Sequence, residues 1–124
     1  MKIIWVTKKR IFEQYKLELA NEENIVFQKE ESDTTHSNWM FGVRIKNIDY
    51  KIKKELELFL YNSGIDSRPM FYDITKHKHL SFISCETTNA KILQSQCIIL
   101  PSYPDLTISQ VMFICNKIKK FFKK

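Results

Sequence analysis

The sequence contains very few residues of the type that forms phosphate-binding loops. Its 124 residues include only two glycines, Gly42 and Gly64, and three prolines. A loop that cradles a phosphate group needs several closely spaced glycines, so we expect no such loop in this chain. Hydrophobic residues make up 44% and aromatic residues 13%, a composition typical of a globular protein and not of a disordered tail. The length favours a single domain over residues 1–124, with no room for a second one.

Long apolar runs and paired cysteines are also absent from the sequence. The first apolar run, Met1–Val6, is interrupted by Lys8–Arg10 and is too short for a secretion signal. No other run approaches the length that crosses a bilayer, so we expect no membrane association. The three cysteines, Cys85, Cys97 and Cys115, form no close pair, which favours reduced and mostly buried thiols. We therefore expect a soluble, cytoplasmic protein.

Positive charge is in excess, with a formal net charge of +6. Five lysines crowd the last eight residues: Lys117, Lys119, Lys120, Lys123 and Lys124. Lysines at this position complement the negative end of a helix dipole, but they are also compatible with a surface that follows nucleic-acid phosphates. We favour the solvated helix end and expect no nucleic-acid partner, because the sequence has no RNA-binding aromatic motif and no helix-turn-helix pattern.

Local patterns predict a mixture of helices and strands. The expected helices cover about 7–20, capped by Thr7, then 49–64, 89–96 and a last helix from Thr107, and the expected strands cover 25–27, 39–45, 65–71 and 97–100. Asp49 can cap the second helix and Gly64 can end it, and Thr107 and Gln110 can form a capping box for the last helix. Residues 72–88 are polar and show no regular periodicity. The clearest strand has Trp39, Phe41, Val43 and Ile45 on one apolar face. Pro69 lacks a backbone donor and places its strand at a sheet edge. The predicted fold class is α+β, with helices on one face of a small, mostly antiparallel sheet.

Four segments, in this order, resemble the C-terminal region of the DegT/DnrJ/StrS family of pyridoxal-phosphate (PLP) sugar aminotransferases. They are the helix Lys9–Tyr15, the strand Trp39–Val43 (WMFGV), the stretch Gly64–Tyr72 (GIDSRPMFY) and the turn Leu100–Thr107 (LPSYPDLT). Together they span nearly the whole chain. The resemblance implies the C-terminal small domain of a fold-type I aminotransferase that acts on nucleotide-sugars.

The resemblance also implies that the family's catalytic groups lie elsewhere. In this family the Schiff-base lysine, the acidic partner of the pyridine nitrogen and the phosphate contacts belong to a large domain upstream of the matched segments. No lysine here stands in the family's Ser-x-x-Lys context. We therefore expect that the large PLP-binding domain is absent and that this chain alone holds no cofactor and no catalytic residue.

Such a chain would be inactive alone or would be half of a split enzyme. Its expected partner is then a large-domain chain or a second copy of itself. The expected docking patch lies at the start of the first helix, around Trp5, Ile11 and Phe12. The alternative is a stand-alone, non-catalytic module that binds nucleotide-sugars or another protein.

By its position in the family motif, Arg68 is a candidate contact for the substrate, together with Tyr72 and His77. The guanidinium of Arg68 suits a diphosphate or a sugar hydroxyl, although a surface ion pair would explain it equally well. Tyr72 presents its hydroxyl or packs its ring. This chain has Asp73 where the family often has proline, so the loop that leads to His77 departs from the family pattern.

The segment His77-Lys78-His79 also raises the possibility of a metal site, with Cys85 or His36 as a further ligand. We do not favour this interpretation, because the spacing to Cys85 matches no established zinc pattern and Lys78 adds a repelling charge. We expect either exposed loop histidines or one histidine in contact with substrate.

Overall fold

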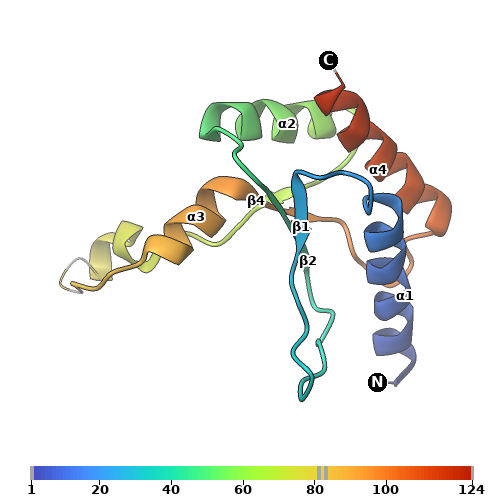
Figure 1. Cartoon of the computed structure of the whole chain (residues 1–124), viewed down its shortest axis with the longest axis horizontal. Coiled ribbons are helices and arrows are strands. Elements are labelled where there is room, and N and C mark those ends of the chain that lie inside the picture. Colours follow the sequence, from blue (N-terminus) through green and yellow to red (C-terminus); the bar gives the residue numbers. More distant parts are fainter. Residues whose placement is uncertain (1, 81, 83, 124) are drawn as a thin grey trace.

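A four-stranded antiparallel sheet lies at the centre of the fold, and we describe it from a computed structural model that covers residues 2–80, 82 and 84–123 (Figure 1). The strands are β1 (Ile25–Phe27), β2 (Phe41–Ile45), β3 (Arg68–Pro69) and β4 (Cys97–Leu100). Their order across the sheet is β1-β2-β4-β3, and every neighbouring pair is antiparallel. Pro69 lies in the edge strand β3, as predicted from its missing donor.

The two faces of the sheet have different surroundings. Phe41, Val43 and Ile45 of β2 are buried, whereas Gly42 and Arg44 between them are only half-buried. Since register partners share a face, the pairing of Val43 with Ile98 of β4 continues the buried side across the sheet. The alternation therefore defines a core face and an opposite, open face.

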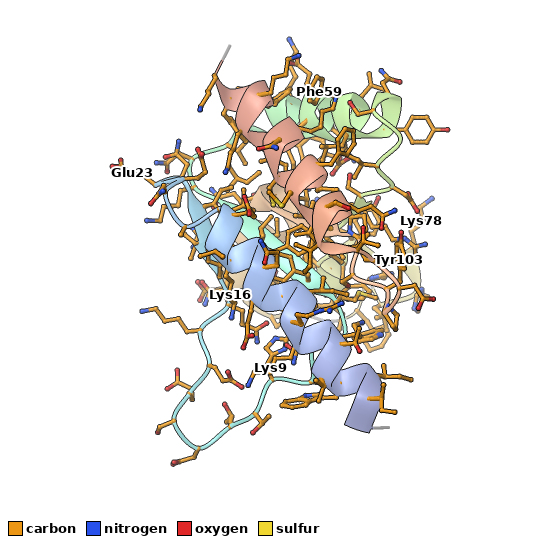
Figure 2. The ribbon with its side chains drawn as sticks, turned by 90° about the vertical axis from the view of Figure 1, so that its right-hand side faces the viewer. Lys9, Lys16, Glu23, Phe59, Lys78 and Tyr103 are labelled. Carbon is orange, nitrogen blue, oxygen red and sulfur yellow. The ribbon has the colours of Figure 1, made fainter. Side chains whose placement is uncertain are left out.

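Three helices pack on the core face: α1 (Lys2–Glu18), α2 (Tyr50–Asn62) and α4 (Ile108–Phe122). Figure 2 shows α1 and α4 side by side in front of the sheet. Each helix contributes fully buried side chains to one apolar cluster with the sheet, including Ile11, Leu56 and Ile118. A shorter helix, α3 (Thr88–Gln96), leads directly into β4. This architecture confirms the predicted fold class.

The helix boundaries are set by capping contacts that the sequence predicted. The carboxylate of Asp49 accepts a hydrogen bond from the Lys51 N–H at 2.6 Å and so begins α2. Gly64 ends α2 with a φ of +78°, the left-handed conformation that favours glycine. Thr107 and Gln110 form the predicted capping box at the start of α4.

Other predictions about side chains were wrong. Thr7 does not cap α1, because the helix already begins at Lys2 and the Thr7 hydroxyl donates to the Ile3 carbonyl within it. Trp39 lies before β2 begins and is 64% exposed. Ile11 and Phe12 cannot form an exposed patch because both are buried in the core.

The segment between β3 and α3 leaves the body of the protein as an irregular excursion. It contains two 3₁₀ turns, η1 (Ile74–Lys76) and η2 (Lys78–Leu80), and lies at the end of α3 away from the sheet (Figure 1). This confirms the prediction of a polar segment without regular periodicity. No helix in the described ranges of the chain has the length and apolarity that a membrane crossing requires.

Candidate functional site

The four motif segments, which are far apart in the sequence, contact one another in the structure. Tyr15 of the first segment stacks on Phe41 of the second with ring centroids 4.6 Å apart. The Tyr15 hydroxyl donates to the carbonyl of Pro101 in the fourth segment at 2.8 Å. The second and third segments meet at Gly42, where an added Cβ would lie 3.3 Å from the Met70 methyl group. The motifs therefore form one connected structure, and the lack of a side chain at Gly42 leaves room for Met70.

A groove of about 560 Å³ lies at the β3 edge of the sheet, and we call it the edge groove. Its walls come from the turn after α2, the turn after β4 and the start of α4. The lining includes Asp66 and Arg68 from one motif and Ser102 and Tyr103 from another. Figure 2 shows Tyr103 beside the start of α4. The edge groove thus combines an apolar floor with a cation and hydroxyl groups, which suits a ligand with polar substituents.

A second groove, of about 660 Å³, lies on the open face of the sheet. Trp39 and Phe71 stack at its rim with ring centroids 6.4 Å apart, and both rings are more than 60% exposed. Arg44 lies in this open-face groove and donates from Nε to the Gln96 side chain at 2.8 Å. The open-face groove is therefore an aromatic surface with one guanidinium group, positioned by Gln96.

Of the three predicted site residues, Arg68 lies at the edge groove and the other two lie outside both grooves. The Arg68 guanidinium is 3.8 Å from the Asp66 carboxylate, and both side chains are more than 70% exposed. An ion pair this exposed contributes little to the stability of the fold, and it leaves the guanidinium accessible to a ligand. Tyr72 is 61% exposed, so its ring is not part of the core. His77 follows η1 and is also exposed.

The histidines of the excursion lie close together but not in the extended segment that a shared metal-binding face would need. His77 and His79 have ring centroids 5.6 Å apart and are separated by the start of η2. Within the described residues, no three His, Cys, Asp or Glu side chains are grouped closely enough to hold a metal ion. His36 is held elsewhere, with its ring 5.7 Å from Phe12.

The thiols differ in their surroundings. Cys97 and Cys115 are buried, as predicted from their apolar neighbours, whereas Cys85 is exposed in the excursion. Burial raises the pKa of the Cys115 thiol to about 12 and also raises the pKa of Cys97. Neither buried thiol is therefore a nucleophile at neutral pH, because nucleophilic attack requires the thiolate.

The described residues do not fit PLP. A Schiff-base lysine must face a cavity, and no described lysine lines the edge groove or the open-face groove. The one lysine that is buried among the described residues, Lys53 of α2, donates from Nζ to the Gln94 carbonyl at 2.6 Å. Burial lowers the pKa of Lys53, but its amine is directed at backbone carbonyls and not at a cavity.

Two buried charged residues were not anticipated from the sequence. Lys53 was not singled out from the sequence, and Asp73 was noted only as a departure from the family's proline. The available signal for Asp73 was the pattern Asp-x-Thr, since an aspartate often accepts a hydrogen bond from the N–H two residues later. The structure shows this bond, from the Thr75 N–H to Asp73 Oδ1 at 2.9 Å.

Two relatives of this chain are GDP-perosamine synthases. The chain is 36% identical over 122 residues to GDP-perosamine synthase from Vibrio cholerae, covering 93% of this chain and 32% of that protein. It is 31% identical over 94 residues to GDP-perosamine synthase from Escherichia coli O157:H7, covering 76% of this chain and 25% of that protein. The chain therefore spans about a third or less of the length of these relatives.

Solved aminotransferase structures share the fold. PseC from Helicobacter pylori, an aminotransferase involved in the biosynthesis of pseudoaminic acid, superposes with a TM-score of 0.85 at 15% identity, over 96% of this chain and 33% of PseC. The sugar aminotransferase Spr1654 from Streptococcus pneumoniae gives 0.85 at 18% identity, over 97% and 31%. The sequence profile of the DegT/DnrJ/EryC1/StrS aminotransferase family matches residues 1–119. Because this match covers nearly the whole chain, the protein belongs to the DegT/DnrJ/EryC1/StrS aminotransferase family.

Proposed function

We propose that this chain acts as the C-terminal small domain of a PLP-dependent nucleotide-sugar aminotransferase. The observation that carries the proposal is the meeting of three of the four motif segments at the edge groove, where Arg68 presents an accessible guanidinium. In this proposal Arg68, Tyr72 and His77 contact the nucleotide-sugar. PLP and the reacting lysine belong to the remaining part of the enzyme, supplied by another domain or another chain.

The surface of α1 supports a partner of this kind. Its first turns expose Ile3, Ile4 and Val6, with Ile3 81% exposed. Apolar side chains grouped on one exposed helix end are typical of a surface that packs on another domain. This patch replaces the one expected around Ile11 and Phe12, which the core already buries.

A chimeric enzyme tests the proposal. The segment of the Vibrio cholerae relative that aligns with this chain is replaced by residues 1–124, and PLP-dependent transamination is measured with that relative's nucleotide-sugar. We expect activity in the chimera and, for Arg68→Ala, a loss of about tenfold in kcat/KM from the missing charged contact. Arg10→Ala is the matched control, because Arg10 is an exposed arginine that lines neither large groove. A folded, PLP-loaded chimera without activity would contradict the proposal.

The second candidate is a stand-alone module that binds nucleotide-sugars without catalysis, and the edge groove is the observation that favours it. Titrating the isolated chain with GDP-perosamine separates the two candidates. Binding that Arg68→Ala weakens supports the module, whereas the absence of binding by the isolated wild-type chain rejects it. Addition of PLP to the isolated chain is expected to give no aldimine absorption band.

A further inference from the structure

Asp73 is a buried carboxylate in an otherwise exposed part of the chain. Its side chain is 1% exposed, whereas its neighbours Tyr72 and Ile74 are 61% and 40% exposed. Among the described residues from 72 to 87, no other side chain is buried. A buried carboxylate destabilises a fold unless hydrogen bonds compensate for its lost hydration, so its partners indicate what it does.

The hydrogen bonds of Asp73 join the two ends of the excursion. Oδ1 accepts from the Thr75 N–H at 2.9 Å, and Oδ2 accepts from the Thr87 hydroxyl at 2.6 Å. The Asp73 N–H donates to the side-chain carbonyl of Gln94 at 3.0 Å. Residues at the beginning of the excursion are thereby tied to its end and to the last turn of α3.

Thr87 gives independent support for this link, because its side chain does not cap α3. It occupies the N-cap position of α3, where a threonine hydroxyl commonly accepts a hydrogen bond from the second or third helical N–H. Here the Thr87 side chain makes no cap hydrogen bond, and its hydroxyl donates to Asp73 instead. The geometry thus favours the link across the excursion over the local cap.

The link continues into the body of the protein through Gln94. The Gln94 backbone carbonyl accepts from Lys53 Nζ at 2.6 Å, and Lys53 is buried on α2. A chain of hydrogen bonds therefore runs from Thr87 through Asp73 and Gln94 to α2. The excursion has no apolar core of its own among its described residues, so these polar contacts connect it to the folded body.

We propose that Asp73 is a positioning residue, whose bond to Thr87 fixes the two candidate substrate contacts that lie close to it in sequence, Tyr72 and His77. The positioning is a property of this chain by itself. What Tyr72 and His77 contact once positioned rests on the proposed function. The replacement of the family's proline by Asp73 then exchanges one local restraint, a fixed φ angle, for another, a carboxylate that accepts hydrogen bonds from the Thr75 N–H and the Thr87 hydroxyl.

Limited trypsin digestion of the purified chain tests the link, because Lys76 and Lys78 are exposed cleavage sites inside the excursion. We expect Asp73→Asn and Thr87→Val to speed cleavage at these sites about tenfold, as loss of a charged hydrogen bond predicts for local opening. Thr87→Ser keeps the hydroxyl and should digest like wild type. The double variant should digest no faster than the faster single variant, because both remove the same bond.

Two exposed positions provide matched controls. Asp66→Asn removes a carboxylate whose ion pair with Arg68 is exposed, and Thr88→Val removes a hydroxyl that bonds to Glu86 at 3.0 Å. Both should leave cleavage unchanged. Wild-type cleavage rates in Thr87→Val, or fast cleavage in Thr87→Ser, would overturn the proposal, and these two variants decide it if Asp73→Asn fails to fold.

Enzyme kinetics with the chimera distinguish a failure of the positioning role of Asp73 from a failure of the proposed function. In the chimera with the Vibrio cholerae relative, we expect Thr87→Val to raise KM for the nucleotide-sugar about tenfold and Thr87→Ser to restore it. Faster cleavage without a change in KM shows that Asp73 holds the excursion but positions no substrate contact, which overturns the positioning role. An inactive chimera with the expected cleavage pattern rejects the proposed function and leaves the Asp73–Thr87 link intact.

Discussion

The body and the excursion of this protein are held together by different forces. In the body, α1, α2 and α4 share one apolar cluster with the core face of the sheet, and Ile11, Val43 and Ile98 are completely buried in it. In the excursion, Asp73 is the one buried side chain among the described residues from 72 to 87. The body is thus stabilised by the burial of many apolar groups, and the excursion by a few specific polar contacts.

This difference affects which substitutions each region tolerates. Apolar cores tolerate exchanges that keep volume and pattern, and the fold matches solved relatives with a TM-score of 0.85 at 15% identity. A polar contact needs a particular donor and a particular acceptor, so a single exchange changes it. The departure from the family's proline at Asp73 lies in the excursion, where we propose that such exchanges alter the position of the substrate contacts.

The largest effect is expected from removing apolar volume in the body. Leu56→Ala on α2 should lower the free energy of unfolding by about 2–5 kcal/mol, because Leu56 is fully buried. Leu58→Ala on the same helix is the control, since Leu58 is 59% exposed and its loss should cost about 0.5 kcal/mol or less. Urea unfolding measures both values. Equal effects of the two substitutions would show that the body is not packed as described.

A smaller effect is expected where the body positions a motif turn through one polar contact. Tyr15→Phe removes the hydroxyl that donates to the Pro101 carbonyl at 2.8 Å and should lower the free energy of unfolding by about 1–2 kcal/mol. Burial raises the pKa of Tyr15, so the hydroxyl keeps the proton that it donates. The stacking of the ring on Phe41 is retained in the variant. Urea unfolding at neutral pH checks the value, and a neutral effect would indicate that water replaces the hydroxyl.

In the body, the sequence predicted those features that depend on residues close to one another in the chain. The strand 97–100 and the capping box at Thr107 were found as predicted, because an apolar run and a cap depend on near neighbours. The burial of Lys53 was not predictable, because its partners Gln94 and Cys97 lie more than forty residues away in the sequence. The exposure of Trp39 was missed for a related reason, since β2 begins only at Phe41.

The candidate site was predictable only as a set of positions in a motif. Pro69 predicted an edge strand for this segment, and the structure confirms that Arg68 and Pro69 form one, whereas the contact of Arg68 with a substrate stays a prediction. The link from Asp73 to Thr87 spans 14 residues, and no periodicity signals it. Contacts across an irregular segment can therefore be identified only from the structure, whereas contacts within helices and strands can be predicted from the spacing of residues in the sequence.

The stabilisation that Asp73 gives to the excursion should depend on pH, unlike the apolar packing of the body. The hydrogen bonds from the Thr87 hydroxyl and the Thr75 N–H hold the pKa of Asp73 below its usual range. A depressed carboxyl pKa stabilises the fold above the unfolded-state pKa, and this contribution is lost as the pH falls through the folded-state pKa. The difference in unfolding free energy between wild type and Asp73→Asn should therefore be present at about pH 6 and shrink towards about pH 2.

Urea unfolding across this pH range, with Asp66→Asn as the exposed control, provides the measurement. Lys91 of α3 is a charged group near the Asp73 carboxylate and also lowers its pKa. Lys91→Gln should therefore reduce, but not abolish, the change of the unfolding free energy with pH. A wild-type profile that runs parallel to that of Asp73→Asn at every pH would show that the carboxylate is not held as described.

The smallest effect on stability is expected at the exposed ion pair of the edge groove. Asp66→Ala should change the free energy of unfolding by about 0.5 kcal/mol or less, because the 3.8 Å pair with Arg68 is exposed on both sides. The same change should strengthen the binding of an anionic nucleotide-sugar in the chimera, since Asp66 competes with the ligand for the guanidinium. A fall in KM without a change in stability would assign Arg68 to the ligand. A loss of stability with unchanged KM would instead show that Arg68 serves the fold. The edge groove would then not differ from the packed body at this residue.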